Sequence, residues 1–443
     1  MATLLHRQNL KAFYTATKMD GLATATGRAA RYFGKIIGDR LDPGYAEFTS
    51  GFTRFHVDQQ KIARIKAANA AFFSQPKPVK TAVWVMPDFH HITNGGPNTI
   101  IRFAHAMSRR GIKVDLVITD GNHYRDPEAV LSDIVDQFGK TDNLKVSYLT
   151  PNRTRELANL PPYDMAFATL WTTAYYVAQH IQAASYFYFV QDFESQFYPA
   201  GTEYGLADST YEFGYFGIFN TPGLMDAVQA HHRMEGVAFS PGFDRDVYYP
   251  AQRPIRIDEY PIRIVFYGRP GVSRNMFELG IDCLRQIKQS FADKVDILVV
   301  GSAKSPVKLD FETRWLGYLP YRETGKLYRS AHVGLALMAT PHPSYLPIQL
   351  MACGVVPLSL ASPYTSWLLR DRVNSICAGP TAIGMAEKFF QAVADTERFD
   401  QMRRNAIATV EPYSWERAMD QSLFRFIEPK PAAELAVDRA PAA

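Results

Sequence analysis

From residue 81 onward the chain alternates short apolar runs with stretches whose apolar residues recur at helical spacing, as in residues 98–110. This alternation is typical of parallel sheets that are covered by helices on both faces. One series of apolar runs predicts strands at 83–86, 114–119, 145–149, 165–170, 186–191, 216–219 and 237–239. The rhythm then restarts and predicts strands at 262–267, 295–300, 314–316, 333–338, 355–360 and 375–377. We therefore expect an α/β protein with two doubly wound, Rossmann-like parallel sheets.

A polar segment marked by prolines, residues 240–254, separates the two series and suits a hinge between domains. The predicted organisation is an N-terminal Rossmann-like domain at 76–245 and a C-terminal one at 246–412. Ser414 suits the cap of a final helix at 413–428. The Pro- and Ala-rich residues 429–443 are expected to be disordered.

Residues 1–75 form a predicted helical arm, in which basic residues outnumber acidic ones before Pro43. Three interpretations stay open: helices that lie on an anionic membrane, an arm packed on the main fold, or a mitochondrial targeting sequence. No run of eighteen apolar residues occurs, so no membrane span is predicted. The expected location is the cytoplasm, with peripheral contact at the inner face of the plasma membrane as an option.

Composition narrows the class of partner. A length of 443 residues with 47% hydrophobic content suffices for two cores. The 48 basic and 44 acidic residues leave a net charge of +4, which argues against a dedicated nucleic-acid binder but fits anionic nucleotides or a membrane surface. Cys283, Cys353 and Cys377 are scattered singly, so we expect core thiols in a reducing compartment.

The apolar run 262–267 ends in Gly268 and Arg269, and Arg274 follows five positions later before a predicted helix. Two guanidiniums and the backbone N–H groups of such a turn converge on a diphosphate. Alone, the pair is equally explained by a solvated loop. A second turn, Gly95-Gly96, follows the strand at 83–86 and lets the backbone approach a phosphate closely.

His91 lies just before that second turn and is a candidate phosphate donor or base, whereas His90 is as readily structural. An aromatic strand at 186–191 delivers Gln191, Asp192 and Glu194 to a loop where such folds place catalytic carboxylates. In an inverting transfer Asp192 would remove the acceptor proton, and in a retaining one it would orient the sugar or acceptor. For most of the aromatic residues at 193–215 we expect ordinary packing.

Two open sheets that face one cleft form the architecture of the GT-B glycosyltransferases. Residues 342–357, HPSYLPIQLMACGVVP, resemble the nucleotide-binding motif of glycosyltransferase family 4. Together with residues 339–345, 189–194 and 265–275, they resemble the WsaF-type rhamnosyltransferases. The resemblance covers most of residues 81–426. It implies a final helix that crosses back to the first domain.

This resemblance implies donor-binding roles for Ser344, Tyr345 and Gln349, beside Gly95, Gly96, Gly268, Arg269 and Arg274. It also implies transfer of L-rhamnose from dTDP-L-rhamnose to a surface polysaccharide or a lipid-linked oligosaccharide. The nucleotide sugar is then a substrate, and no cofactor is expected. Since the arginines can neutralise a diphosphate and no residues have metal-ligand spacing, we expect a metal-independent reaction.

One position departs from the family 4 pattern. Gln349 stands where those proteins generally carry a glutamate that contacts the nucleotide ribose, and a first glutamate has no counterpart here. An amide binds a diol less strongly than a carboxylate does. The alternative function is therefore a catalytically silent GT-B module that acts as a carbohydrate-binding or scaffolding subunit.

Overall fold

The computed structural model describes residues 52–89, 91–93, 95–119, 126–149, 151–303 and 308–427. The chain divides into two compact units, residues 1–56 and 57–443, and the second unit holds both sheets. Of the first unit the structure describes residues 52–56, with the short 3-10 helix η2 (Phe52–Arg54). The predicted basic arm before Pro43 and the predicted tail at 429–443 lie outside the described residues. Within the described part, no helix combines the length and apolarity that a membrane crossing needs.

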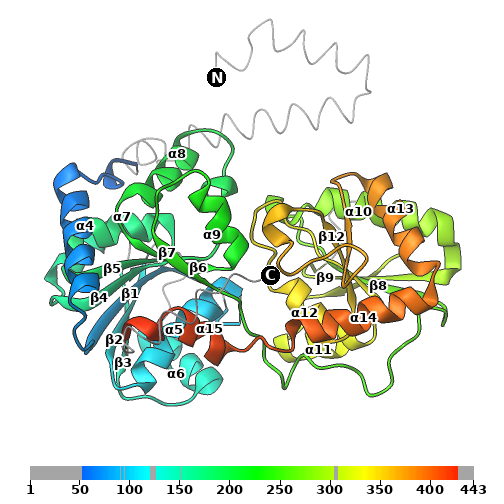
Figure 1. Ribbon diagram of the computed structural model, residues 1–443, viewed down its shortest axis with the longest axis horizontal. Helices are drawn as coiled ribbons and strands as arrows, with labels where there is room; N and C mark the ends of the chain where they lie inside the picture. Colours follow the sequence, from blue (N-terminus) through cyan, green and yellow to red (C-terminus); the bar gives the residue numbers. More distant parts are fainter. Residues whose placement is uncertain are drawn as a thin grey trace, which may run out of the picture. The chain divides into compact units, whose positions relative to one another are not determined.

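The first sheet has seven parallel strands in the order β3-β2-β1-β4-β5-β6-β7. Helices α7, α8 and α9 lie on one face and α5 and α6 on the other (Figure 1). The strands are β1 (Thr81–Pro87), β2 (Lys113–Thr119), β3 (Leu144–Tyr148), β4 (Tyr163–Ala168), β5 (Ala183–Val190), β6 (Phe216–Asn220) and β7 (Gly236–Phe239). The helices are α4 (Gln59–Ser74), α5 (Gly95–Arg109), α6 (Pro127–Phe138), α7 (Trp171–His180), α8 (Thr202–Ser209) and α9 (Pro222–Gln229), with 3-10 turns η3 (Pro151–Asn159), η4 (Glu194–Phe197) and η5 (Thr210–Glu212). We call this sheet with its covering helices the N-terminal lobe.

The second sheet has six parallel strands in the order β10-β9-β8-β11-β12-β13. The strands are β8 (Ile262–Tyr267), β9 (Val295–Val300), β10 (Arg314–Gly317), β11 (Val333–Leu335), β12 (Val356–Leu360) and β13 (Ile376–Ala378). The helices are α10 (Phe277–Phe291), α11 (Tyr321–Arg329), α12 (Leu346–Ala352), α13 (Ala382–Val393) and α14 (Thr396–Val410), with 3-10 turns η6 (Ser273–Asn275), η7 (Ala292–Lys294) and η8 (Pro363–Thr365). We call this sheet with its helices the C-terminal lobe.

Both sheets reverse their strand order beside their first strand, between β1 and β4 and between β8 and β11. The predicted fold of two doubly wound parallel sheets is thus confirmed, and each predicted strand overlaps an observed one. The run at 333–338 predicts a longer strand than β11, which ends at Leu335. Leu337 continues the apolar run but packs in the core of the C-terminal lobe from a loop. In open α/β sheets, ligands bind outside the carboxyl ends of the strands at the reversal point.

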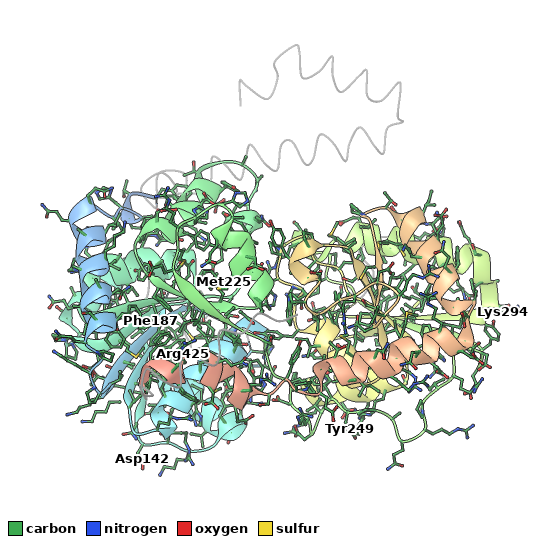
Figure 2. The ribbon with its side chains drawn as sticks, in the orientation of Figure 1. Asp142, Phe187, Met225, Tyr249, Lys294 and Arg425 are labelled. Carbon is green, nitrogen blue, oxygen red and sulfur yellow. The ribbon has the colours of Figure 1, made fainter. Side chains whose placement is uncertain are left out.

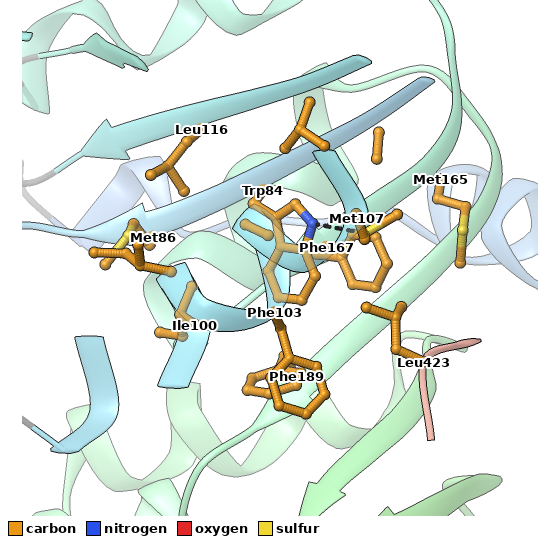
Figure 3. Packing of buried hydrophobic residues seen from close by; sticks show 14 of the residues in the cluster. Trp84, Met86, Ile100, Phe103, Met107, Leu116, Met165, Phe167, Phe189 and Leu423 are labelled. Atoms are coloured by element: carbon orange, nitrogen blue, oxygen red, sulfur yellow. Dashed lines mark hydrogen bonds between the residues drawn. The ribbon is translucent and has the colours of Figure 1, made fainter. Parts of the chain in front are cut away.

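The strands are apolar on both faces because helices cover both faces. Five consecutive residues of β1, Ala82 to Met86, are fully buried. Trp84 stacks on Phe167 of β4 with ring centroids 4.0 Å apart, and its indole N–H donates to the Met107 sulfur of α5 at 3.3 Å (Figure 3). This cluster joins β1, its neighbour and the helix that follows it. The three cysteines are buried and free, as predicted.

The last two helices, α15 (Trp415–Gln421) and α16 (Phe424–Ile427), pack in the core of the N-terminal lobe. The Ser414 hydroxyl caps α15 by accepting the Arg417 N–H at 3.1 Å, as predicted. Phe426 of α16 lies 5.6 Å from Phe187 of β5 between ring centroids; Figure 2 labels Phe187 and the neighbouring Arg425. Helices α15 and α16 therefore complete the core of the N-terminal lobe.

The segment between β7 and β8, predicted as a hinge, is fastened to both lobes at Asp244. Its carboxylate accepts from the Arg102 guanidinium of α5 at 2.9 and 3.1 Å and from the Tyr321 hydroxyl of α11 at 2.9 Å. Arg102 and Asp244 are mostly buried, with exposed side-chain fractions of 16% and 15%. Through Asp244, this polar segment therefore connects to both lobes, by an ion pair to α5 and a hydrogen bond to α11.

Candidate functional site

Asp192 stands where the two lobes meet. It follows β5 in the N-terminal lobe and is only 5% exposed. One carboxylate oxygen accepts the Phe193 N–H at 2.8 Å, and the other accepts the hydroxyl of Thr340 at 3.0 Å. Thr340 lies in the loop after β11 of the C-terminal lobe. This hydrogen bond therefore joins the carboxyl ends of strands from both sheets.

The two candidate diphosphate ligands have different surroundings. Arg274, in η6, places its Nε 3.9 Å from an Asp192 oxygen, with its guanidinium carbon 4.4 Å from the Phe197 ring centroid. Arg269 is exposed, and its stem lies over Gly301 at the end of β9, because a Cβ on Gly301 would come within 3.2 Å of the arginine Cγ. Arg274 thus faces the N-terminal lobe, while Arg269 lies on the C-terminal one.

Burial raises the pKa of both predicted carboxylates, but to different extents. Burial raises the pKa of Asp192 to about 6, although the Thr340 hydroxyl, the Phe193 N–H and Arg274 all favour its charged form. Burial raises the pKa of Glu194 to about 8, and its Oε2 accepts from the Tyr188 hydroxyl and the Trp171 N–H. Glu194 is fully buried, and its raised pKa favours the protonated form at neutral pH. Of the two, Asp192 is the carboxyl that is ionised at pH 7.

The loop from Thr340 to Tyr345 has a strained turn. Ser344 has a φ of 67°, in the left-handed region that non-glycine residues rarely adopt. Its N–H donates to Nδ1 of His342 at 3.0 Å. Burial, followed by the charge of Arg274, lowers the pKa of His342 to about 3, so this imidazole is neutral.

Tyr345 reaches across to the N-terminal lobe. Its hydroxyl bonds to the Thr99 hydroxyl of α5 at 2.6 Å and accepts from the Asn220 amide at the end of β6. Its ring covers Gly95, where a Cβ would come within 2.8 Å of the ring. Gly95, which was predicted to let the backbone approach a phosphate, is thus packed against the Tyr345 ring, while no atom of the described residues, apart from the adjacent backbone, lies within 4 Å of a Cβ on Gly96.

The remaining predicted residues are more dispersed. His91 is exposed on the loop between β1 and α5. Gly268 donates its N–H to Val300 at 2.8 Å, and a Cβ there would come within 3.0 to 3.2 Å of three apolar side chains. Gln349 is half-buried on α12, and its backbone N–H bonds to Tyr345. The structure thus brings Asp192, Arg274 and the 340–345 loop together, and leaves His91 at the surface.

Sequence reasoning placed Thr340 and His342 in the motif at 339–345 without giving either a role, and it missed Asn220 and Thr99. The sequence could have indicated Asn220, because it is a polar residue at the end of an apolar strand. Asp192 was predicted from a similar position after β5. The Asn220 amide donates to the side-chain oxygen of Gln191 at 3.0 Å. Thr99 had no such signal, because it lies inside a helix.

Comparison with known proteins places this geometry in context. Family models for the N-terminal and C-terminal domains of WsaF match residues 88–221 and 262–389. The O-antigen biosynthesis protein RfbC of Myxococcus xanthus is 40% identical over 373 residues, which are 83% of this chain and 28% of that protein. The chain thus spans just over a quarter of the length of this relative.

Two solved structures have the same fold at low sequence identity. Sucrose-phosphate synthase from Thermosynechococcus elongatus has a TM-score of 0.58 at 12% identity, over 81% of this chain and 98% of that one. HepE of Anabaena, in complex with UDP and glucose, has a TM-score of 0.57 at 14% identity, over 81% and 99%. The fold is therefore GT-B.

We expect Asp192→Asn to stabilise the protein more at pH 7 than at pH 4. The pKa of Asp192 in the folded protein lies above its ordinary value of 3.8. The folded protein therefore binds this proton more tightly than the unfolded chain does, and protonation of Asp192 favours folding. In the wild-type protein this proton contributes on the order of 2–3 kcal/mol to the free energy of unfolding below pH 4, and the contribution is lost as the pH rises through about 6. Denaturant unfolding of both proteins at the two pH values measures it. The control is Asp142→Asn, whose side chain is 87% exposed; the same difference between Asp192→Asn and wild type at both pH values would contradict the raised pKa.

Proposed function

Because the chain belongs to the WsaF family, we propose that it is a glycosyltransferase that moves L-rhamnose from dTDP-L-rhamnose to a growing surface polysaccharide or a lipid-linked oligosaccharide. The name of RfbC, an O-antigen biosynthesis protein, supports a polysaccharide acceptor. The complexes of HepE with UDP and with UDP-glucose support a nucleotide-sugar donor. The rhamnosyl group rests on the resemblance of residues 339–345 and 189–194 to WsaF-type enzymes.

One observation carries the proposal: a buried carboxylate of one lobe, Asp192, lies against a guanidinium of the other, Arg274. A transferase whose active site lies between two lobes needs positively charged groups beside the leaving diphosphate and a carboxylate near the acceptor. We assign the diphosphate to Arg269 and Arg274 and the acceptor side to Asp192. In an inverting transfer Asp192 takes the acceptor proton, and in a retaining transfer it orients the sugar.

Transfer assays with dTDP-L-rhamnose, UDP-glucose and a GDP-sugar test the function, with donor hydrolysis followed in parallel. As a base, Asp192 is active above its pKa of about 6, so turnover should rise as the pH passes that value. Asp192→Asn should lower turnover by about 10²–10⁴-fold and leave nucleotide affinity within a few-fold. Turnover that survives in this variant would remove Asp192 from the chemistry and leave Glu194 or His91 to be tested.

Removing either arginine should weaken nucleoside diphosphate binding by on the order of 1.5–3 kcal/mol, because each would lose charge-assisted hydrogen bonds. Calorimetry on Arg269→Ala and Arg274→Ala measures this. Arg322→Ala is the control, since Arg322 pairs with Asp246 on an exposed surface of the C-terminal lobe. Unchanged affinity in both site variants would remove the assignment. We further propose that the arginines serve in place of a divalent ion, so turnover should persist in EDTA.

Gln349→Glu should tighten nucleoside diphosphate binding if this side chain reaches the ribose. An ionised acceptor makes a stronger hydrogen bond to a hydroxyl than an amide does. Calorimetry on the variant, with its melting temperature as a check on folding, decides the point. Equal or weaker binding in a folded variant would show that Gln349 does not contact the ribose.

The same residue favours the second candidate function, a silent GT-B module that binds or scaffolds carbohydrate. Gln349 stands at the position where the resembled family carries a carboxylate, so donor binding without turnover is the outcome that this alternative predicts. Donor hydrolysis or transfer by the wild-type protein separates the two functions. Nucleotide binding alone does not, because both predict it.

For the basic arm we propose contact with an anionic membrane, which would bring the enzyme to a lipid-linked acceptor. Flotation with anionic liposomes should carry the full chain and lose it when residues before Pro43 are deleted. The attraction should weaken with salt, since charges beyond a Debye length are screened. Equal flotation of both proteins would favour a packing role for the arm.

A further inference from the structure

Two buried histidines of the C-terminal lobe differ in one respect. His332 and His342 are 4% and 5% exposed, and each accepts a backbone N–H at Nδ1, from Arg263 at 2.9 Å and from Ser344 at 3.0 Å. The Nε2 of His332 also bonds to a backbone carbonyl, that of Arg256, at 3.0 Å. The Nε2 of His342 has no hydrogen-bond partner among the described residues.

The unpartnered nitrogen of His342 is a donor. A backbone N–H can only donate, so Nδ1 must be unprotonated and the ring proton of the neutral imidazole lies on Nε2. A buried donor without an acceptor is unfavourable, and most buried polar atoms in native proteins have a partner. The structure thus leaves a neutral, buried N–H group unpaired in the loop whose Thr340 donates to Asp192.

Two amide side chains of the N-terminal lobe also carry buried polar atoms without a hydrogen-bond partner among the described residues. Asn220 is fully buried, and its Nδ2 donates to Gln191 and Tyr345, but its Oδ1 has no partner among the described residues. Gln191 accepts at Oε1, and its buried Nε2 is also unpartnered. The Tyr345 ring links this pair to His342, with ring centroids 5.7 Å apart. Unpartnered donors and an acceptor from both lobes therefore lie around Tyr345.

We propose that His342, Gln191 and Asn220 bind the hydroxyl groups of the donor sugar, with Nε2–H of His342 donating to one of them. The proposal rests on the proposed glycosyltransferase function and names the part of the donor that these residues recognise. All three groups are neutral, which suits hydroxyls that both donate and accept, whereas the phosphates suit Arg274. His342 follows Thr340 in the loop that touches Asp192, so the sugar it holds lies beside the candidate catalytic carboxylate.

His342→Asn tests the assignment with little other change. The shorter amide oxygen can still accept the Ser344 N–H, while the donor at the Nε2 position is lost. We expect calorimetry to show about tenfold weaker binding of dTDP-L-rhamnose, or of the sugar nucleotide that wild-type protein selects, and unchanged binding of the nucleoside diphosphate. His342→Gln, which reaches farther with its amide N–H, should restore most of the loss. His332→Asn is the matched control and should lower the melting temperature without changing sugar affinity.

Deoxy analogues of the donor provide a second measurement that uses the wild-type protein. The analogue that lacks the contacted hydroxyl should bind wild-type protein about tenfold more weakly and should bind His342→Asn and wild type alike. If wild type binds the sugar nucleotide and His342→Asn binds it equally well, this inference is wrong and the proposed function stands. If wild type binds and hydrolyses no sugar nucleotide, the proposed function itself is wrong.

Discussion

The hydrogen bond from the Thr340 hydroxyl to the Asp192 carboxylate is the contact on which the candidate site depends. Each sheet is parallel and reverses its strand order beside its first strand, so each presents polar loops at one edge. Where those edges meet, the carboxylate is shielded from water by one lobe and held by a hydroxyl of the other. Its raised pKa, its proximity to Arg274 and its position beside the 340–345 loop all follow from that meeting.

The region around this contact contains several features that oppose folding. It contains a raised carboxyl pKa, a left-handed Ser344 and buried polar atoms of His342 and Asn220 that lack partners. The packing around Trp84, by contrast, is apolar and stacked, and the Trp84 indole N–H has an acceptor. Strain and unmet hydrogen bonds concentrate at functional sites because a ligand must find unused groups there.

Residues that act through their own strand or turn could be predicted from the sequence. The apolar runs located the strands, and the position of Asp192 after an aromatic strand indicated the edge of a sheet where it lies. Contacts between segments far apart in sequence could not be predicted. Tyr345 bonds to Asn220 and Thr99, which are 125 and 246 residues away, so nothing in its local pattern shows that it covers Gly95. The unpartnered Nε2 of His342 depends on the same packing and has no sequence signal.

The two final helices have a consequence for synthesis of the chain. Domains generally fold in the order in which they leave the ribosome. Here, Trp415, Met419 and Phe424 belong to the core of the N-terminal lobe, although the whole C-terminal lobe is made before them. Part of the apolar surface of the N-terminal lobe therefore stays uncovered while the C-terminal lobe is translated. A chain that stops before α15 would expose this apolar surface and would lack an intact N-terminal domain.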